Sequence, residues 1–287
     1  MPILTSQRLQ EYRAETFRTA PGRRVYSRQE AIDYVNQRGF IFFWPIKDVT
    51  MPSLWAAAAG DRPVADEHDD PGHITWDWKD SLLGARRWYY GRILRRRNTI
   101  LSLATAPYFY ALTPNYGDPQ SDYLQQYEDG QLTNEAKAVY EVLLNEGPQD
   151  TLELRRKSHL GNSSRFNKAL DDLQIEMKAT PVGISPVGAF RYAFIYDLVH
   201  RHLPEIPEQA RLIDETAARV ELLKHFFQSV GYATLQDVRR LFAWPPEPAQ
   251  TALVGLVSAG FLLDGVELQD QAAGGFALAS FFDVDSR

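Results

Sequence analysis

The chain has 287 residues, of which 44% are hydrophobic, and it contains no cysteine. This length is enough for one to three compact domains with substantial cores. The lack of cysteine excludes disulfides, zinc sites with thiolate ligands and a cysteine nucleophile. No apolar run approaches the roughly 18 residues that cross a bilayer, and residues 1–19 are polar, so we expect a cytoplasmic protein without a membrane partner.

The charge of the chain is unevenly distributed. A formal net charge of −6 argues against a surface that is basic throughout, because phosphate binding depends on clustered lysines and arginines. A single stretch nevertheless carries six arginines and no acid: Arg86, Arg87, Arg92, Arg95, Arg96 and Arg97. We call these residues the arginine cluster, and we expect them to form a local cationic surface on an acidic protein.

The first part of the chain is predicted to be mainly helical. Residues 1–26 have a weak apolar pattern and are expected to form an N-terminal arm. Ser27 is a suitable N-cap for a helix that ends at Gly39. The apolar run from Phe40 to Ile46 predicts a short buried segment, and helices are expected over 53–59, 76–84 and 85–97. We therefore predict one helical module, rich in aromatic residues and arginine, over residues 27–118.

The pattern changes to α-α-α-β-β between residues 119 and 206. Helices are predicted over 133–145, 150–159 and 163–173, and extended segments over 175–182 and 190–195. This order is typical of a winged helix, in which the third helix reads DNA. That helix has an apolar face, and its opposite face carries Arg165, Asn167 and Lys168.

The same order recurs between residues 207 and 287. Helices are predicted over 216–229, 235–242 and 249–259, followed by apolar stretches over 261–268 and 275–280. Two such units about 85 residues apart predict a mainly α protein with small β-hairpins, built from tandem winged-helix (helix-turn-helix) modules. The third helix of the second module carries Glu247 and no basic residue, which favours a scaffold over a DNA reader.

Three stretches of the chain resemble a known family. They are VNQRGFIFFWPIKDVTMPSLWAAAAG at 35–60, TWDWKDSL at 75–82 and ARVELLKHFFQSVGYATLQDVRRLF at 218–242. They are similar to the AlkZ-like winged-helix DNA glycosylases, a bacterial-type family, and the resemblance extends over most of the chain. It implies tandem winged helices, DNA as the partner and a role in the repair of damaged or crosslinked DNA.

The catalytic motif of that family has no counterpart here. In the family, a Gln-x-Gln or Gln-x-Asp motif after a Gly-apolar-apolar stretch serves hydrolysis of the N-glycosidic bond. Alignment on Gly39 places the motif positions at Phe42 and Trp44, neither of which can position a water, accept its proton or stabilise an oxocarbenium ion. Residues 41–46 contain no polar side chain, so another carboxylate would be needed, and Asp48 is the candidate.

Two groups of residues are candidates for contact with nucleic acid. The arginine cluster surrounds Trp88, Tyr89 and Tyr90, a composition suited to phosphate binding and base stacking, and Trp44 is a further stacking candidate. Alternatively, these arginines pair with the acidic residues of 61–80 and the rings form core. In the first winged helix the candidates are Arg155, Arg156, Lys157, Arg165, Asn167 and Lys168. Winged helices also serve as protein-interaction modules, so that alternative stays open.

Metal and cofactor sites have little support in the sequence. Asp66, His68 and His73 have the side chains of a divalent metal site, but acidic loops of this kind are usually solvated, so we expect no metal. No Gly-rich phosphate loop, Walker motif, nucleophile elbow or dinucleotide fingerprint is present, and we expect no cofactor. His200 and His202, spaced two apart, are expected at the surface.

Three hypotheses follow from the sequence. In the first, the chain is a DNA-binding protein that uses its first winged helix and the arginine cluster. In the second, it is an active DNA glycosylase in which Asp48 replaces the missing motif. In the third, it is a non-catalytic interaction or structural protein whose aromatic residues form only its core.

Overall fold

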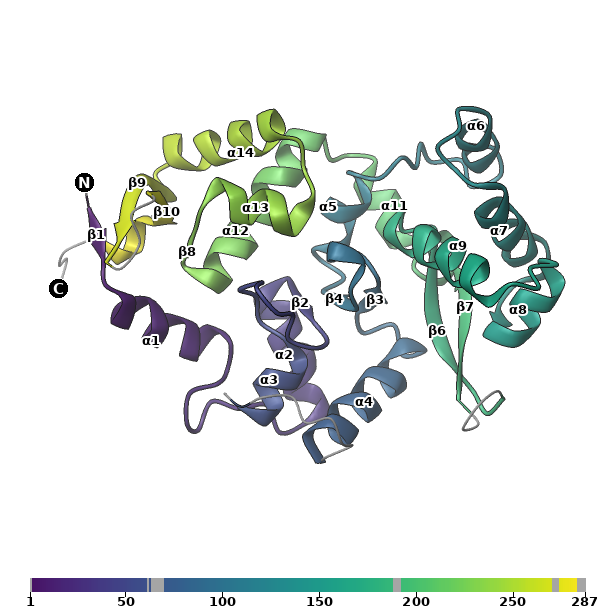
Figure 1. Cartoon of the computed structure of the whole chain (residues 1–287), viewed down its shortest axis with the longest axis horizontal. Coiled ribbons are helices and arrows are strands. Elements are labelled where there is room, and N and C mark those ends of the chain that lie inside the picture. Colours follow the sequence, from purple (N-terminus) through teal and green to yellow (C-terminus); the bar gives the residue numbers. More distant parts are fainter. Residues whose placement is uncertain (1, 61, 63–69, 188–191, 270–273, 283–287) are drawn as a thin grey trace. The chain divides into compact units, whose positions relative to one another are not determined.

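The computed structural model describes residues 2–60, 62, 70–187, 192–269 and 274–282. The chain divides into two compact units, one formed by residues 1–75 with 215–287 and the other by residues 76–214. Both consist mainly of helices with small sheets, which confirms the expected fold class at this level (Figure 1). No helix of the described part is long and apolar enough to span a bilayer. The domain limits expected after residues 26, 118 and 206 stay predictions.

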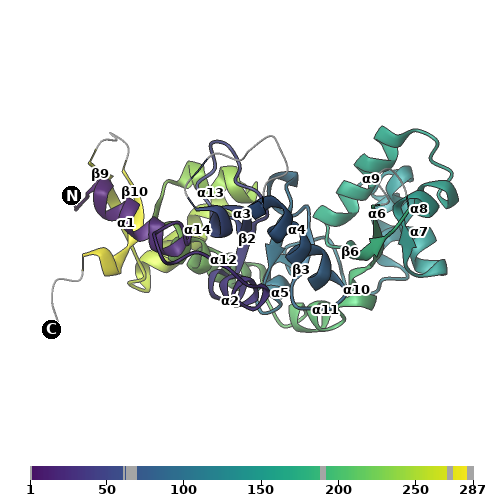
Figure 2. The ribbon, with the colours of Figure 1, turned by 90° about the horizontal axis from the view of Figure 1, so that it is seen from below.

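The first unit combines the two ends of the chain. Its N-terminal elements are β1 (Ile3–Leu4), α1 (Ser6–Thr16), α2 (Arg28–Arg38), β2 (Phe40–Phe42) and α3 (Leu54–Ala59). Its C-terminal elements are α12 (Glu215–Val230), β8 (Tyr232–Ala233), α13 (Leu235–Phe242), α14 (Pro246–Ser258), β9 (Leu262–Leu268) and β10 (Gly275–Leu278). Strand β1 pairs in parallel with β9, in a sheet of order β1-β9-β10-β8, and Figure 2 shows α1 beside these strands.

Side chains of α1 and α2 bind the carbonyl groups at the C-terminal end of α12. Arg13 donates to the carbonyls of Val230 at 2.8 Å and Tyr232 at 3.0 Å, and Thr16 donates to that of Ser229 at 2.7 Å. The Gln228 carbonyl accepts at 2.7 Å from both the Tyr12 hydroxyl and the Arg38 guanidinium. The last carbonyls of a helix have no partner within it, and cations are favourable at its negative end. The N-terminal arm therefore caps α12.

Burial makes this cap sensitive to the loss of a donor. Desolvation lowers the pKa of Arg13 to about 10 and also lowers that of Arg38. Both guanidinium groups are thus partly shielded from water, and the carbonyl groups are their partners there. The helix ends at Gly231, whose φ of +75° suits glycine. A Cβ there would stand 3.0 Å from the rings of Phe281 and Tyr12, so a larger residue would also clash.

The second unit contains the elements between α3 and α12. In chain order its elements are α4 (Asp70–Leu83), whose first turns precede the unit, β3 (Tyr89–Gly91), η1 (Leu94–Arg96), β4 (Thr99–Leu101), α5 (Ala106–Tyr110), α6 (Asp122–Glu128), α7 (Asn134–Glu146), β5 (Gln149–Asp150), α8 (Thr151–Lys157), α9 (Ser163–Ile175), β6 (Ala179–Ser185), β7 (Ala193–Leu198), α10 (Val199–His202) and α11 (Glu205–Ala210).

Helices α7, α8 and α9 enclose one core with a sheet of order β5-β7-β6. Buried residues from all three helices and from β7 meet in this core, among them Leu143, Leu154, Phe166 and Leu198. The predicted order of three helices and two strands is observed. Strand β6 begins at Ala179 rather than at Ile175, because α9 continues to Ile175 and the chain then turns at Met177, which has a φ of +51°.

The prediction of a helix over residues 85–97 is wrong. The chain forms β3 there, whose Tyr90 lies opposite Ile100 of β4, and then the short helix η1. Positive φ angles at Arg86, Arg95 and Arg96 are incompatible with a continuous α-helix. The aromatic residues of this stretch favour a strand, and pairing with β4 decides the outcome over the helical preference of its arginines.

His202 is buried rather than exposed. Its Nε2 lies 3.2 Å from the carbonyl oxygen of Leu83, near the end of α4, and only 9% of the residue is accessible. Burial lowers the pKa of His202, and it also lowers that of the half-buried His200. Spacing along the chain did not show this, because the contact comes from a residue far away in sequence.

We expect Arg13→Ala to lower the free energy of unfolding by about 2 kcal/mol, because two carbonyls lose a charged donor inside the protein. Urea unfolding followed by circular dichroism measures the change. Arg23→Ala is a control with the same change of charge, since Arg23 forms an exposed ion pair with Glu15, of a kind worth about 0–1 kcal/mol. Equal midpoints for the two variants would contradict the capping role of Arg13.

Acid should destabilise the protein in part through His202. The folded state binds a proton at this ring less tightly than the unfolded chain, where histidine titrates near pH 6.5. The stability from neutral His202 is therefore present above about pH 6.5 and lost as the pH falls through the lower pKa of the folded state. We expect the urea midpoint to fall between about pH 7.5 and 5.5, and to fall less in His202→Gln. The same pH dependence in both proteins would refute this role.

Candidate nucleic-acid interface

Helix α9 has one buried and one exposed face. Asn162 caps its N-terminus by accepting from the backbone amides of Ser164 and Arg165, at 2.9 and 3.2 Å. Phe166, Ala169, Leu170 and Leu173 are buried, whereas the polar residues of the first two turns are exposed: Ser163, Ser164, Arg165, Asn167 and Lys168. The packing of the apolar residues against α7 and the sheet sets the direction of the exposed ones.

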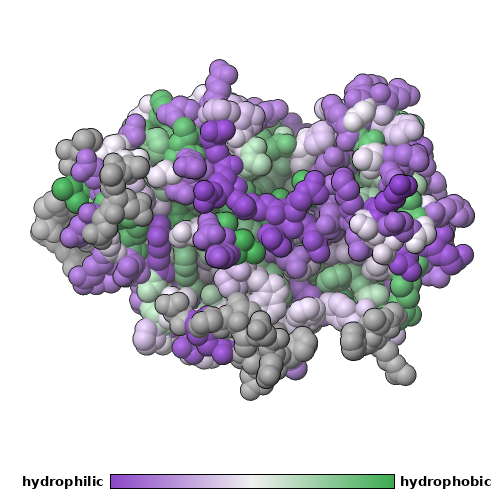
Figure 3. Space-filling view, viewed as in Figure 1, coloured by the Kyte–Doolittle hydropathy of each residue, from purple (hydrophilic) through white to green (hydrophobic). Residues whose placement is uncertain are grey.

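The first half of α9 presents cations with few acids near them. Its first turn contains no acidic residue. The Arg165 side chain is 71% exposed and lies 3.8 Å from Glu135, and that of Lys168 is 65% exposed and lies 2.6 Å from Asp172. Glu135 and Asp172 are only 30% and 16% exposed, but both cations extend into solvent, where phosphate can bind them beside these carboxylates. Figure 3 shows hydrophilic side chains over the region where Figure 1 places α9.

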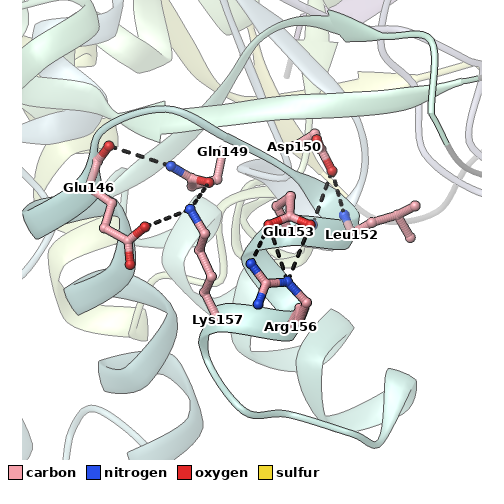
Figure 4. A network of polar contacts seen from close by, with 7 residues as sticks. All are labelled: Glu146, Gln149, Asp150, Leu152, Glu153, Arg156 and Lys157. Atoms are coloured by element: carbon pink, nitrogen blue, oxygen red, sulfur yellow. Dashed lines mark hydrogen bonds and ion pairs between the residues drawn. The ribbon is translucent and has the colours of Figure 1, made fainter.

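The cations of α8 have partners as close as that of Lys168, whereas the ion pair of Arg165 is longer. Arg156 binds Glu153 through two nitrogens, the closest contact being 2.6 Å, and these hydrogen bonds hold the pKa of Glu153 below its usual value. Lys157 contacts both Gln149 and Glu146, at 2.8 and 2.6 Å (Figure 4). Arg155 is half-buried. Of the cations predicted for this module, Arg165, Arg156 and Lys168 have the most exposed side chains, at 71%, 67% and 65%, and Arg165 has the longest ion pair.

The arginine cluster lies on either side of β3 and does not form one helix face. Arg92 binds Asp171 at 3.1 Å and Arg96 binds Asp172 at 2.8 Å, which ties the loop around η1 to the second half of α9. These described partners belong to α9 and not to the expected region 61–80. Burial raises the pKa of Asp171, although Arg92 and Arg96 oppose this. Four further arginines of the cluster are exposed: Arg86, Arg87, Arg95 and Arg97.

The residues expected to stack on bases lie mostly inside the protein. Trp88, Tyr89 and Tyr90 are 2%, 0% and 3% accessible, so they offer no open ring face to a base in this structure. Trp44 is half-buried, with its ring centroid 6.0 Å from that of Trp55. The burial of the first three rings fits the alternative in which they form core.

The two family motif positions carry no group for hydrolysis. Phe42 is 1% accessible on β2, and Trp44 packs edge-on against Phe43, with ring centroids 5.1 Å apart. Asp48 nearby is exposed, has a φ of +60° and lines a pocket of about 190 Å³. The other polar side chains of this pocket are Arg13, Thr50, Tyr232, Asp237 and Arg240. Sequence reasoning missed these partners, because most of them lie far from Asp48 in the chain.

Two of the three candidate metal ligands are not among the residues that the structure describes. Asp66 and His68 belong to residues that the structure does not describe, and His73 is exposed on α4. Among the residues that are described, no three histidine or acidic side chains are grouped closely enough to hold a metal ion.

A cleft of about 460 Å³ lies beside α9 in the second unit. Asn167 and Asp171 of α9, Arg92, and Leu152 of α8 line it. Its aromatic residues are Tyr192, Phe194 and Tyr196, which alternate along β7 and the residue before it. Sequence reasoning missed this aromatic cleft. The spacing of two was the available signal, because alternate residues of a strand face the same side.

A buried lysine supports the aromatic wall of the cleft. The Lys79 ammonium lies 2.7 Å from the Asp80 carboxylate and 4.6 Å from the centroid of the Phe194 ring. The Tyr192 hydroxyl accepts from Lys79 at 2.9 Å and from Trp76 at 3.1 Å, and donates to Asp80 at 3.0 Å. Burial lowers the pKa of Lys79, while Asp80 opposes this shift. The network therefore fixes the position of the Tyr192 ring.

Comparisons with known proteins identify the family of the chain. Among solved structures, the Streptomyces sahachiroi DNA glycosylase AlkZ is similar, with a TM-score of 0.60 and 13% sequence identity over 98% of this chain and 71% of that one. At this sequence identity, the similarity is evidence for a shared fold only. No curated protein matches. The family described as AlkZ related matches residues 25–243, most of the chain, and the chain therefore belongs to the AlkZ-related family.

Proposed function

We propose that this protein binds double-stranded DNA through α9 and acts in the recognition of damaged DNA. The observation that carries the proposal is the first half of α9, an exposed helix face with Arg165, Asn167 and Lys168 and no acid in its first turn. An exposed basic helix N-terminus is suited to phosphate, because the helix dipole and the nearby cations attract anions there.

The arrangement of α7, α8, α9, β6 and β7 supports a winged helix, with α9 as recognition helix and the β6–β7 hairpin as wing. Helices α12, α13 and α14 with β9 and β10 repeat this order, so we interpret the chain as carrying tandem winged-helix modules. The second module has Glu247 in the first turn of α14 and no basic residue on that helix. We assign it a scaffold role.

A role with damaged DNA rests on the family and on the fold. The similar solved structure is named as a DNA glycosylase, and its likeness extends over nearly the whole of this chain. The chain lacks polar residues at Phe42 and Trp44, so recognition of DNA is the part of such a function that its residues support best.

A glycosylase remains the second candidate, favoured by the pocket around Asp48. There a carboxylate stands beside Arg13, Asp237 and Arg240 in a concave site. A carboxylate can activate a water or stabilise the cationic sugar of the transition state, and the arginines can bind the phosphates that flank it. The exposure of Asp48 leaves it accessible to a substrate.

The double variant Arg165→Ala/Lys168→Ala should bind a labelled duplex about tenfold more weakly than the wild type, and its affinity should depend on salt with a slope smaller by about two. Fluorescence anisotropy at several salt concentrations measures both quantities. Arg23→Ala/Arg239→Ala removes the same charge from exposed positions of the other unit and should bind normally. Absence of wild-type binding at low salt, or equal affinities, would sink the proposal.

For the second candidate, release of an alkylated base from a duplex is the direct assay. We expect Asp48→Asn to slow any such release by at least about 100-fold and to leave affinity for DNA unchanged, because the carboxylate acts on the reacting atoms. Asp33→Asn, at an exposed position of α2, is the matched control. Lack of turnover by the wild type, or normal turnover by Asp48→Asn, removes this candidate.

A further inference from the structure

The aromatic cleft beside α9 adjoins the surface that the proposed function uses and shares Asn167 with it. Its volume of about 460 Å³ lies within the roughly 300–1,000 Å³ of small-molecule sites. Tyr192 and Phe194 are half-buried, so each ring is both held and partly accessible. The hydrogen bonds of the Tyr192 hydroxyl with Lys79 and Asp80 fix the position of the Tyr192 ring. A rigid, partly open aromatic wall is suited to a flat ligand.

The polar side chains of the cleft narrow the class of ligand. The Asn167 amide offers one donor and one acceptor in a plane, the pattern that matches the edge of a nucleobase such as adenine. Asp171 adds a carboxyl group and Arg92 adds a guanidinium, 44% exposed, that can reach a phosphate. Aromatic faces, a planar amide and a cation together form the chemistry of a nucleotide site.

The location of the cleft indicates where that nucleotide comes from. Asn167 lies on α9 between Arg165 and Lys168, the two residues proposed to contact the DNA backbone. If DNA binds at α9, a base that leaves the base stack of that DNA lies next to the cleft. Extrusion costs a few kcal/mol, least where the base is unpaired or damaged, so a site that holds such a base selects damaged DNA.

We propose that the aromatic cleft lined by Tyr192, Phe194, Asn167 and Leu152 binds a single unpaired nucleobase of DNA held on α9. This deepens the proposed function and rests on it. The cleft then supplies the preference for distorted DNA, whereas Arg165 and Lys168 supply affinity for any duplex.

The test compares two labelled duplexes that differ only by one bulged adenine, using the full chain and anisotropy at one salt concentration. We expect the wild type to bind the bulged duplex about tenfold more tightly, because stacking of one base on aromatic side chains has this order of effect. Leu152→Trp places a large ring in the cleft and should abolish the preference without changing affinity for the paired duplex. Leu212→Trp, at a leucine that is 90% exposed and outside the cleft, should keep the preference.

The outcomes separate this inference from the proposed function. Binding that depends on Arg165 but shows no preference for the bulge, or a preference that survives Leu152→Trp, overturns the inference alone. If no duplex is bound, the proposed function fails, and saturation-transfer NMR with deoxyadenosine monophosphate then decides about the cleft. Binding of that nucleotide which Leu152→Trp removes supports a base site, whereas no binding, or binding that persists, overturns it.

Discussion

The capping of α12 by the N-terminal arm is the interaction on which the first unit depends. The carbonyls near the end of this helix accept from Arg13, Thr16 and Tyr12 of the arm and from Arg38 of α2, and those that are shielded from water would cost stability without a donor. The arm also pairs β1 with β9, and its Arg13 lines the pocket that contains Asp48. Stability and the candidate catalytic pocket therefore share one residue.

In the second unit, charge on α9 is divided along the helix. Its first half presents Arg165 and Lys168, and its second half carries Asp171 and Asp172, which hold Arg92 and Arg96 of the arginine cluster. The acids neutralise arginines that would otherwise repel one another, while the N-terminal half stays accessible to an anion. This division explains how a chain with a net charge of −6 can present a surface for DNA. In our two proposals, affinity for DNA and selection of a base therefore involve neighbouring parts of one helix.

Whether this member of the AlkZ-related family can hydrolyse a glycosidic bond depends on the residues that it carries. Phe42 is buried and Trp44 packs against Phe43, but neither bears a group that could activate water. Any hydrolysis would have to use a carboxylate in another position, and Asp48 is placed for it in a pocket with two arginines. The DNA binding that we propose requires no such replacement, because it uses exposed residues of α9.

Local features could be predicted from the sequence alone: the cap at Ser27, the order of helices and strands around α9, and the two faces of that helix. These depend on side chains a few residues apart, whose spacing is visible in the chain. The strand at Tyr90, the burial of Trp88, the pairing of β1 with β9 and both the Asp48 pocket and the aromatic cleft came only from the tertiary structure. Each of them joins segments distant in sequence, and packing between such segments overrides the local preference that a sequence pattern records.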